Sequence, residues 1–173
     1  MTAVRTTPKF RIGRLDHVHI RVPDRAVAAA WYADNLGFEP VDEYEFWAKG
    51  VDGGPLQISA DGGVTSLALF QASPAEPIVA QRVAFSVDAE QFVAFARSLP
   101  GAICGIDGEA LRPNDVRDFD LCWAFDLADP WGHQYELNCY DYRAVERELI
   151  EVDGIAPVRY WPADLHREYL DRR

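Results

Sequence analysis

The sequence lacks an excess of positive charge. Its 17 Lys and Arg residues stand against 28 Asp and Glu residues, and the net charge is −11. Such a surface repels phosphate backbones and anionic lipid headgroups, so we expect no nucleic acid and no membrane as a partner. No apolar run approaches the ~20 residues that span a bilayer. Residues 1–14 are polar and basic without an apolar core, so they do not resemble a secretory signal.

Cysteine is scarce as well. The three cysteines, Cys104, Cys122 and Cys139, have no metal-binding spacing and form no even set of disulfide partners. They favour reduced, mostly buried thiols and a cytoplasmic location. The sequence also lacks a nucleophile elbow, a P-loop and a dinucleotide fingerprint, so it gives no support to those enzyme classes.

The sequence does contain one short module twice. Residues 17–22 (HVHIRV) and 82–87 (RVAFSV) both carry apolar side chains at their second, fourth and sixth positions. A helix-like stretch follows each run, at residues 24–36 and 88–99, and a glycine lies at or near the end of each stretch. Because duplicated units bury a face against each other, the repeat predicts that two copies enclose one shared site.

The remaining patterns complete two βαβββ modules, at residues 15–71 and 79–140. Period-two alternation between glycine-rich breaks predicts strands near residues 15–22, 38–44, 56–60, 65–71, 82–87, 103–106, 121–127 and 134–140. We expect Asp24 to cap the first helix and Gly37 to end it. The polar segment 108–119 is expected to be an exposed loop near the mouth of a pocket.

Both ends of the chain lie outside the repeat. Residues 1–14 are expected to form an N-terminal arm, and residues 141–173 a C-terminal helical extension with helices at 142–150 and from Asp164. Tyr160, Trp161 and Tyr169 indicate that this extension docks on an apolar surface. It either covers the pocket or packs on a partner subunit, and the sequence leaves both open.

Strand alternation assigns side chains to faces. Successive side chains of a strand point to opposite faces, and the helices should cover the apolar ones. The opposite faces then collect side chains that suit a polar binding pocket: His17, His19, Arg21, Arg82, Ser86, Gln134, Glu136 and Asn138. Trp123 fits the core, and in a cup-shaped sheet it can also stack on a ligand.

Three segments carry a resemblance. They are residues 15–20 (LDHVHI), residues 31–38 (WYADNLGF) and residues 129–137 (DPWGHQYEL). Together with the duplicated βαβββ plan, they resemble the vicinal oxygen chelate superfamily, which includes glyoxalase I, extradiol dioxygenases, and fosfomycin- and bleomycin-resistance proteins. The third segment is the most specific, since it is similar to the Asp-Pro-x-Gly turn and Glu-bearing strand of that group. The resemblance covers about residues 15–140.

The resemblance implies an α+β fold in which two βαβββ modules form a curved, mixed, eight-stranded sheet with a concave pocket. It also implies a homodimer and a divalent metal (Fe, Mn, Zn or Ni) that chelates adjacent substrate oxygens. Carried over, the metal ligand of the first strand is His17 and that of the eighth strand is Glu136. The fifth-strand position falls on Arg82, which has donors only, and the fourth-strand position on Leu67. Glyoxalase I activity is therefore not expected.

Two functions follow as hypotheses. The leading one is a small-molecule enzyme, an isomerase, lyase or dioxygenase acting on an organic substrate with adjacent oxygens. Its metal ligands would be His17 and Glu136, and in a metal-free version one of these two would act as base. His19 lies ~7 Å from His17 along a regular strand, so it is not expected to become a third ligand. The catalytic set is Glu136, His17 and Arg82, and the substrate-binding set is His19, Arg21, Ser86, Gln134, Asn138 and Trp123.

The alternative is a metal-free small-molecule-binding protein of the resistance or sequestration kind. In it, an ion pair between Arg82 and Glu136 takes the place of the metal. A paired buried carboxylate loses little, whereas an unpaired one costs several kcal/mol. A purely structural dimer module ranks last, because it leaves the polar face unexplained.

Overall fold

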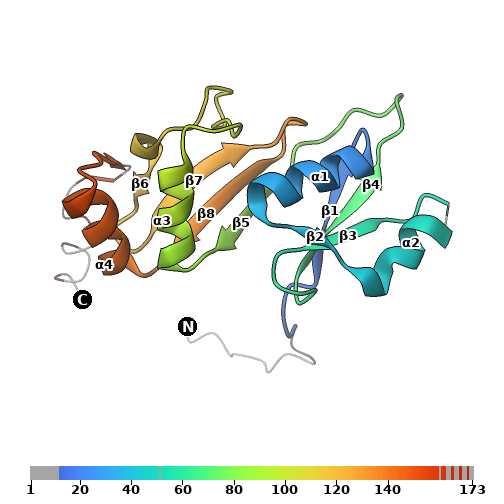
Figure 1. Ribbon diagram of the computed structural model, residues 1–173, viewed down its shortest axis with the longest axis horizontal. Helices are drawn as coiled ribbons and strands as arrows, with labels where there is room; N and C mark the ends of the chain where they lie inside the picture. The colour runs from blue at the N-terminus through green and yellow to red at the C-terminus, as the bar shows by residue number, and fades with distance from the viewer. Residues whose placement is uncertain are drawn as a thin grey trace, which may run out of the picture. The chain divides into compact units, whose positions relative to one another are not determined.

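The computed structural model describes residues 12–50 and 52–159, and beyond them residues 161, 162, 165, 168 and 171. The chain forms two compact units that divide between Glu76 and Pro77. Each unit holds one of the two βαβββ modules, which confirms the α+β fold (Figure 1). No helix in these ranges is both long enough and apolar enough to cross a membrane.

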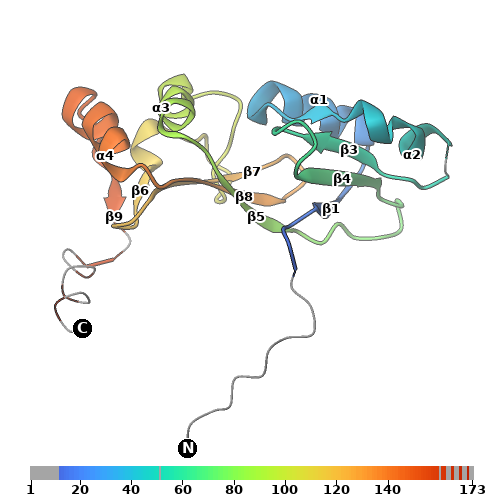
Figure 2. The same ribbon diagram turned by 90° about the horizontal axis from the view of Figure 1, so that it is seen from below.

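The first unit is a four-stranded sheet with helices on one side. Its elements are β1 (His17–Val22), α1 (Arg25–Leu36), β2 (Glu39–Pro40), the 3₁₀ turn η1 (Asp42–Tyr44), α2 (Glu45–Gly50), β3 (Leu56–Ser59) and β4 (Ser66–Gln71). The strand order is β1-β4-β3-β2, with β1 parallel to β4 and the other pairs antiparallel. Figure 2 shows α1 and α2 on the same side of this sheet.

Both expected caps of α1 are confirmed. The Asp24 carboxylate accepts from the backbone N–H groups of Ala26 at 2.8 Å and Val27 at 3.0 Å, which satisfies two donors that a helix N-terminus leaves open. Gly37 ends the helix at φ 70°, a left-handed conformation that a residue with a Cβ adopts at a cost. The helix is thereby fixed between two residues recognised from the sequence.

The strand predicted at residues 38–44 is wrong beyond its start. β2 ends at Pro40, and residues 42–50 are helical instead. Proline has no N–H for a sheet ladder, and the acidic residues Asp42, Glu43 and Glu45 favour a helix N-terminus. Lys49 also pairs with Glu45 one turn away, at 2.5 Å.

The second unit is a five-stranded sheet. Its elements are β5 (Arg82–Ser86), α3 (Ala89–Ser98), the 3₁₀ turn η2 (Pro113–Asp115), β6 (Arg117–Asp118), β7 (Trp123–Ala128), β8 (Gln134–Cys139), α4 (Tyr142–Val145), the π-helical turn η3 (Glu146–Val152) and β9 (Val158–Arg159). The strand order is β5-β8-β7-β6-β9, with β5 parallel to β8 and β6 parallel to β9. Seven of the eight predicted strands form, at least in part, and they are divided between two hydrogen-bonded sheets, with β6 and the β9 strand of the C-terminal extension as additions that were not predicted.

The segment between α3 and β7 differs from its prediction. The strand expected at residues 103–106 is reduced to isolated bridges from Cys104 to Ala110 and Ala128. The segment 108–119, expected to be an exposed loop, contains η2 and β6 and buries Leu111 and Val116. These two apolar side chains are the reason that the segment folds onto the sheet despite its polar composition.

The predicted division of faces is confirmed in both units. On β1, Ile20 and Val22 are fully buried whereas His19 and Arg21 are exposed. In the second unit the Phe92 ring of α3 lies 5.2 Å from the Phe125 ring of β7. The apolar face of each sheet therefore packs against its helices, and the polar face is left for other contacts.

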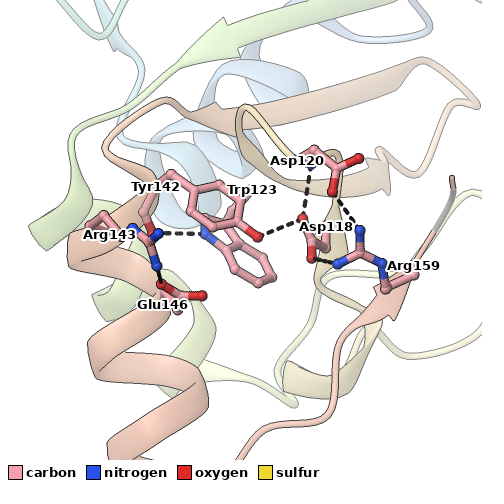
Figure 3. Close-up of polar contacts among 7 residues, drawn as sticks. All are labelled: Asp118, Asp120, Trp123, Tyr142, Arg143, Glu146 and Arg159. Atoms are coloured by element: carbon pink, nitrogen blue, oxygen red, sulfur yellow. Dashed lines mark hydrogen bonds and ion pairs between the residues drawn. The ribbon is translucent and has the colours of Figure 1, made fainter. Parts of the chain in front are cut away.

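The C-terminal extension packs on its own unit (Figure 3). Trp123 donates from Nε1 to the Tyr142 carbonyl oxygen at 3.0 Å, and their rings stack 4.8 Å apart. The Tyr142 hydroxyl donates to Asp118 at 2.9 Å. Arg159 of β9 pairs with Asp118 at 2.5 Å and also with Asp120. Tyr160, Asp164 and Tyr169 lie outside the described residues, as do residues 1–11 of the predicted arm.

The Tyr142 contact predicts a pH dependence. Burial raises the pKa of the Tyr142 hydroxyl, and the hydrogen bond to Asp118 raises it further. The folded protein thus holds this proton more tightly than the unfolded chain, where the pKa is about 10. The stabilisation is complete below about pH 10 and is lost as the pH rises through the folded pKa.

We therefore expect the unfolding free energy of the wild type to fall more steeply between about pH 10 and 12 than that of Tyr142→Phe. Urea denaturation across this range measures both slopes. Parallel curves would show that the Tyr142 hydroxyl loses no stabilising contact on ionisation.

Candidate functional site

The polar face of the second unit gathers charged side chains from neighbouring strands. Glu136 of β8 has Asp126 of β7 and Ala84 of β5 as its cross-strand partners. Directly opposed residues point to the same face of a sheet, so Glu136 and Asp126 share a face. Tyr135 and Leu137, which precede and follow Glu136 on β8, point to the other face, and this face packs on α3.

Two arginines bind these carboxylates. Arg82 donates from Nη2 to Asp126 Oδ1 at 2.9 Å and to Glu136 Oε2 at 3.3 Å. Arg117 of β6 places Nε 3.2 Å from Asp126 Oδ2. The predicted contact of Arg82 with Glu136 is confirmed, although it is diagonal, because the residue directly opposite Arg82 is Gln134. We call Arg82, Arg117, Asp126 and Glu136 the charge network.

Sequence reasoning missed two members of the charge network, Arg117 of β6 and Asp126 of β7. Asp126 is the more deeply buried of the two. Its side chain is only 6% exposed, and it is held between two guanidinium groups. It lies within the aromatic segment WAFDLA, which indicates a core strand. The available signal was its alternation with Ala124 and Ala128, which assigns Asp126 to the face opposite Phe125.

The charge network continues through Asn138. The Asn138 amide donates from Nδ2 to Glu136 Oε1 at 2.8 Å, so both oxygens of Glu136 have partners. The Cys122 thiol lies 3.9 Å from Asn138 Oδ1 as a weak donor. Burial raises the pKa of Cys122, and the charge of Glu136 raises it further. The thiol therefore stays protonated and lacks the thiolate character of a nucleophile.

A pocket of about 290 Å³ lies in this unit beside the charge network. Arg117 and Asp126 line it from the sheet, and residues 105–107, 109–112 and 115 line it from the segment between α3 and β6. Val158 of the C-terminal extension lines it as well. The charge network thus borders a space that can hold a small molecule.

The other predicted site residues of this unit are distributed differently. Ser86 of β5 and Gln134 of β8 share the polar face, opposite Asn138 and Arg82 respectively. Trp123, predicted to bind substrate, pairs with Cys139 on the helix-covered face and is 2% exposed. Its indole N–H is bonded to Tyr142, so the structure places Trp123 in the core and away from the polar face.

The first unit holds a separate polar group on β1. His17 Nδ1 lies 2.7 Å from Asp16 Oδ2, and His17 Nε2 lies 3.0 Å from His19 Nε2. Because a carboxylate only accepts, Nδ1 of His17 carries the proton, and a neutral His17 then accepts at Nε2 from His19. The two rings stack with their centroids 5.0 Å apart, which is closer than the ~7 Å of regular strand spacing. That His19 is not a third metal ligand stays a prediction.

Two other residues of the first unit bear on the prediction. Arg21 shares this polar face and pairs with Glu76 at 3.1 Å in an exposed position. Leu67 is opposite Val18 and buried on the helix-covered face, so the β4 residue opposite His17 is Ser66. The Ser66 hydroxyl donates to Gln57 at 2.6 Å.

The convergence of His17 with Arg82 and Glu136 stays a prediction, because His17 belongs to the first unit and the other two to the second.

The charge network does not fit a divalent metal ion. Both Glu136 oxygens are engaged, and Arg82 and Arg117 bring two positive charges that would repel a cation. Among the residues described, no group of three or more His, Cys, Asp or Glu side chains is placed to hold an ion. Arg82 occupies the fifth-strand position where the resemblance implies a metal ligand, and a guanidinium has donors only.

The family follows from comparison with known proteins. A family model described as the Glyoxalase/Bleomycin resistance protein/Dioxygenase superfamily matches residues 14–137. The chain belongs to this superfamily. Among curated proteins, no sequence matches it.

Several solved structures share the fold. The chain is similar to the oxidase ChaP-H2, with 23% identity over 75% of this chain and 94% of that one, at a TM-score of 0.56. It is similar to TnmS3, an antibiotic-binding protein from Streptomyces sp. CB03234, with 22% identity, coverages of 76% and 99%, and a TM-score of 0.54. A glyoxalase/dioxygenase from Nostoc punctiforme matches at 20% identity, coverages of 80% and 99%, and a TM-score of 0.52.

The burial of Asp126 predicts that this side chain contributes substantially to the free energy of unfolding. Asp126→Asn keeps the shape but leaves Arg82 and Arg117 side by side without the buried carboxylate. We expect a loss of about 1–3 kcal/mol in unfolding free energy, the range for a buried group that loses its partner. The matched control is Glu76→Gln, which breaks an exposed pair with Arg21 and should cost about 1 kcal/mol or less. Urea denaturation measures both, and equal losses would contradict a central role for Asp126.

Proposed function

We propose that this protein binds an organic small molecule with adjacent oxygens on the polar face of its second unit, with arginine in place of a metal. One observation carries the proposal. Both oxygens of Glu136 are engaged, one by Arg82 and the other by Asn138, while Arg82 also holds the buried Asp126. The positive charge that an ion supplies elsewhere in this superfamily is supplied here by a side chain.

Arginine suits adjacent oxygens for a geometric reason. A guanidinium carries five N–H donors in a fixed fork, and this fork matches two neighbouring acceptors. The ion pairs of the charge network use Nη2 of Arg82 and Nε of Arg117. Arg117 lines the pocket, and we assign its other nitrogens to the ligand as donors, whereas Arg82 holds Asp126 and Glu136 beside it.

Charge and size narrow the ligand class. The pocket is lined by the four carboxylates of Asp107, Glu109, Asp115 and Asp126 and by the two guanidinium groups of Arg112 and Arg117. A ligand in this pocket is therefore expected to be neutral. The pocket of about 290 Å³ is at the lower end of the range for small-molecule sites. An aromatic 1,2-diol of one or two rings meets both conditions.

The comparisons support binding of this kind. TnmS3 is described as an antibiotic-binding protein, and its resemblance here is one of fold. Binding without chemistry needs the pocket and the charge network but no nucleophile, in agreement with the protonated Cys122 thiol. Homodimer formation and a cytoplasmic location stay predictions of the sequence.

A metal-free enzyme is the second candidate, and the β1 group favours it. Asp16, His17 and His19 form a hydrogen-bonded chain that orients two imidazoles, as a general base requires. Turnover of an aromatic 1,2-diol by the metal-free protein, lost in His19→Gln, would support this candidate over a pure binder.

Metal content tests the proposal directly. Protein purified without a chelator should contain no stoichiometric divalent ion by elemental mass spectrometry. Arg82→His removes the cation and adds a ligand beside Glu136, so this variant should take up Zn²⁺ or Ni²⁺. Arg117→His leaves the Arg82–Glu136 pair in place and serves as the matched control. A stoichiometric ion in the wild type would contradict the replacement of metal by arginine.

Ligand binding gives a second test. 4-Nitrocatechol is a coloured aromatic 1,2-diol, so its absorbance reports binding. Arg117→Met should weaken its affinity about 10–100-fold, since a hydrogen bond to a charged group contributes about 1.5–3 kcal/mol. Arg143→Met removes an exposed arginine of α4 that pairs with Glu146 and should have no effect. Equal affinities in the wild type and Arg117→Met would exclude Arg117 as a ligand contact.

A further inference from the structure

We propose that the C-terminal extension sets the size of the ligand, because β9 forms one wall of the pocket. This inference rests on the proposed function of that pocket. It assigns a role to residues 142–159, which lie outside the part of the chain matched by the superfamily. The residue that touches the ligand would be Val158, and the one that positions it would be Arg159.

The wall is formed by strand pairing. β9 runs parallel to β6, with Val158 paired to Arg117 and Arg159 paired to Asp118. The Val158 amide donates to the Val116 carbonyl oxygen at 2.8 Å. Val158 lines the same pocket as Arg117, so the apolar wall lies beside a guanidinium that we assign to the ligand.

Arg159 follows Val158 and binds β9 to β6 on the face of the sheet opposite the pocket (Figure 3). We call its contact with Asp118 the anchor. Asp118 is 3% exposed and accepts from the Tyr142 hydroxyl, from Arg159 and from the Asp120 amide. A buried carboxylate is costly without such partners. Arg159 is therefore held on β6, and Tyr142 connects the same carboxylate to α4.

Alternation along β6 and β9 couples the wall to the anchor. Arg117 and Val158 point to the pocket, whereas Asp118 and Arg159 point to the other side. A slip of one residue reverses the faces of a strand. It would replace Val158 at the wall by Pro157 or Arg159, depending on its direction, and remove Arg159 from Asp118. The pair of Arg159 with Asp118 thus keeps β9 in the register that places the apolar Val158 at the pocket.

The test compares two probes of different size. 4-Nitrocatechol has one ring, and esculetin is a fluorescent aromatic 1,2-diol with two fused rings. Val158→Ala should raise the affinity for esculetin relative to 4-nitrocatechol by about tenfold, and Val158→Trp should lower this ratio, because a single methylene at a pocket wall discriminates by about 10–200-fold. A general loss of structure would change both affinities together and leave the ratio unchanged.

Val152→Ala is the matched control, because Val152 is an exposed valine of the same extension that does not line the pocket. Arg159→Met should shift the ratio in the same direction as Val158→Ala by loosening the anchor. A wild type that binds neither probe would overturn the proposed function. A wild type that binds both, with Val158→Ala indistinguishable from Val152→Ala, would overturn the role of the extension alone.

Discussion

The polar face of the second unit depends on the buried carboxylate of Asp126 and its two arginine partners. A carboxylate that is 6% exposed needs positive partners, and it has them in Arg82 from β5 and Arg117 from β6. These two strands lie on either side of the β7–β8 pair, so one buried charge links both flanks of the sheet. The same arrangement directs two guanidinium groups to one polar face and leaves no site for a cation there.

Local signals explain why most of the fold was predictable. Asp24 and Gly37 specify helix ends by hydrogen bonding and backbone conformation, and both function as expected. Strand alternation assigned the buried faces correctly in each unit. One prediction failed at residues 42–50, where proline and acidic residues favour a helix after Pro40. Another failed where tertiary contacts decide, since residues 108–119 fold onto the sheet through Leu111 and Val116.

The candidate site was predicted in part. Alternation brought Arg82, Glu136 and Asn138 to one face, and the structure joins them by hydrogen bonds. Asp126 escaped notice because a single acidic residue in an aromatic strand has no pattern of its own, and its partners are distant in sequence. Trp123 shows the converse, since its bulk suits a ligand surface and a core equally well. Its pairing with Cys139 and its hydrogen bond to Tyr142 place it in the core.

The parallel pairing of β9 with β6 also has a consequence for solubility. Without β9, β6 would end the sheet and present unpaired backbone groups, a known template for intermolecular strand addition. β9 itself is only two residues long and carries the cationic Arg159, features that make a poor template. The extension therefore covers the edge of β6 and hinders strand addition by another molecule. A chain shortened before residue 158 is expected to aggregate more readily.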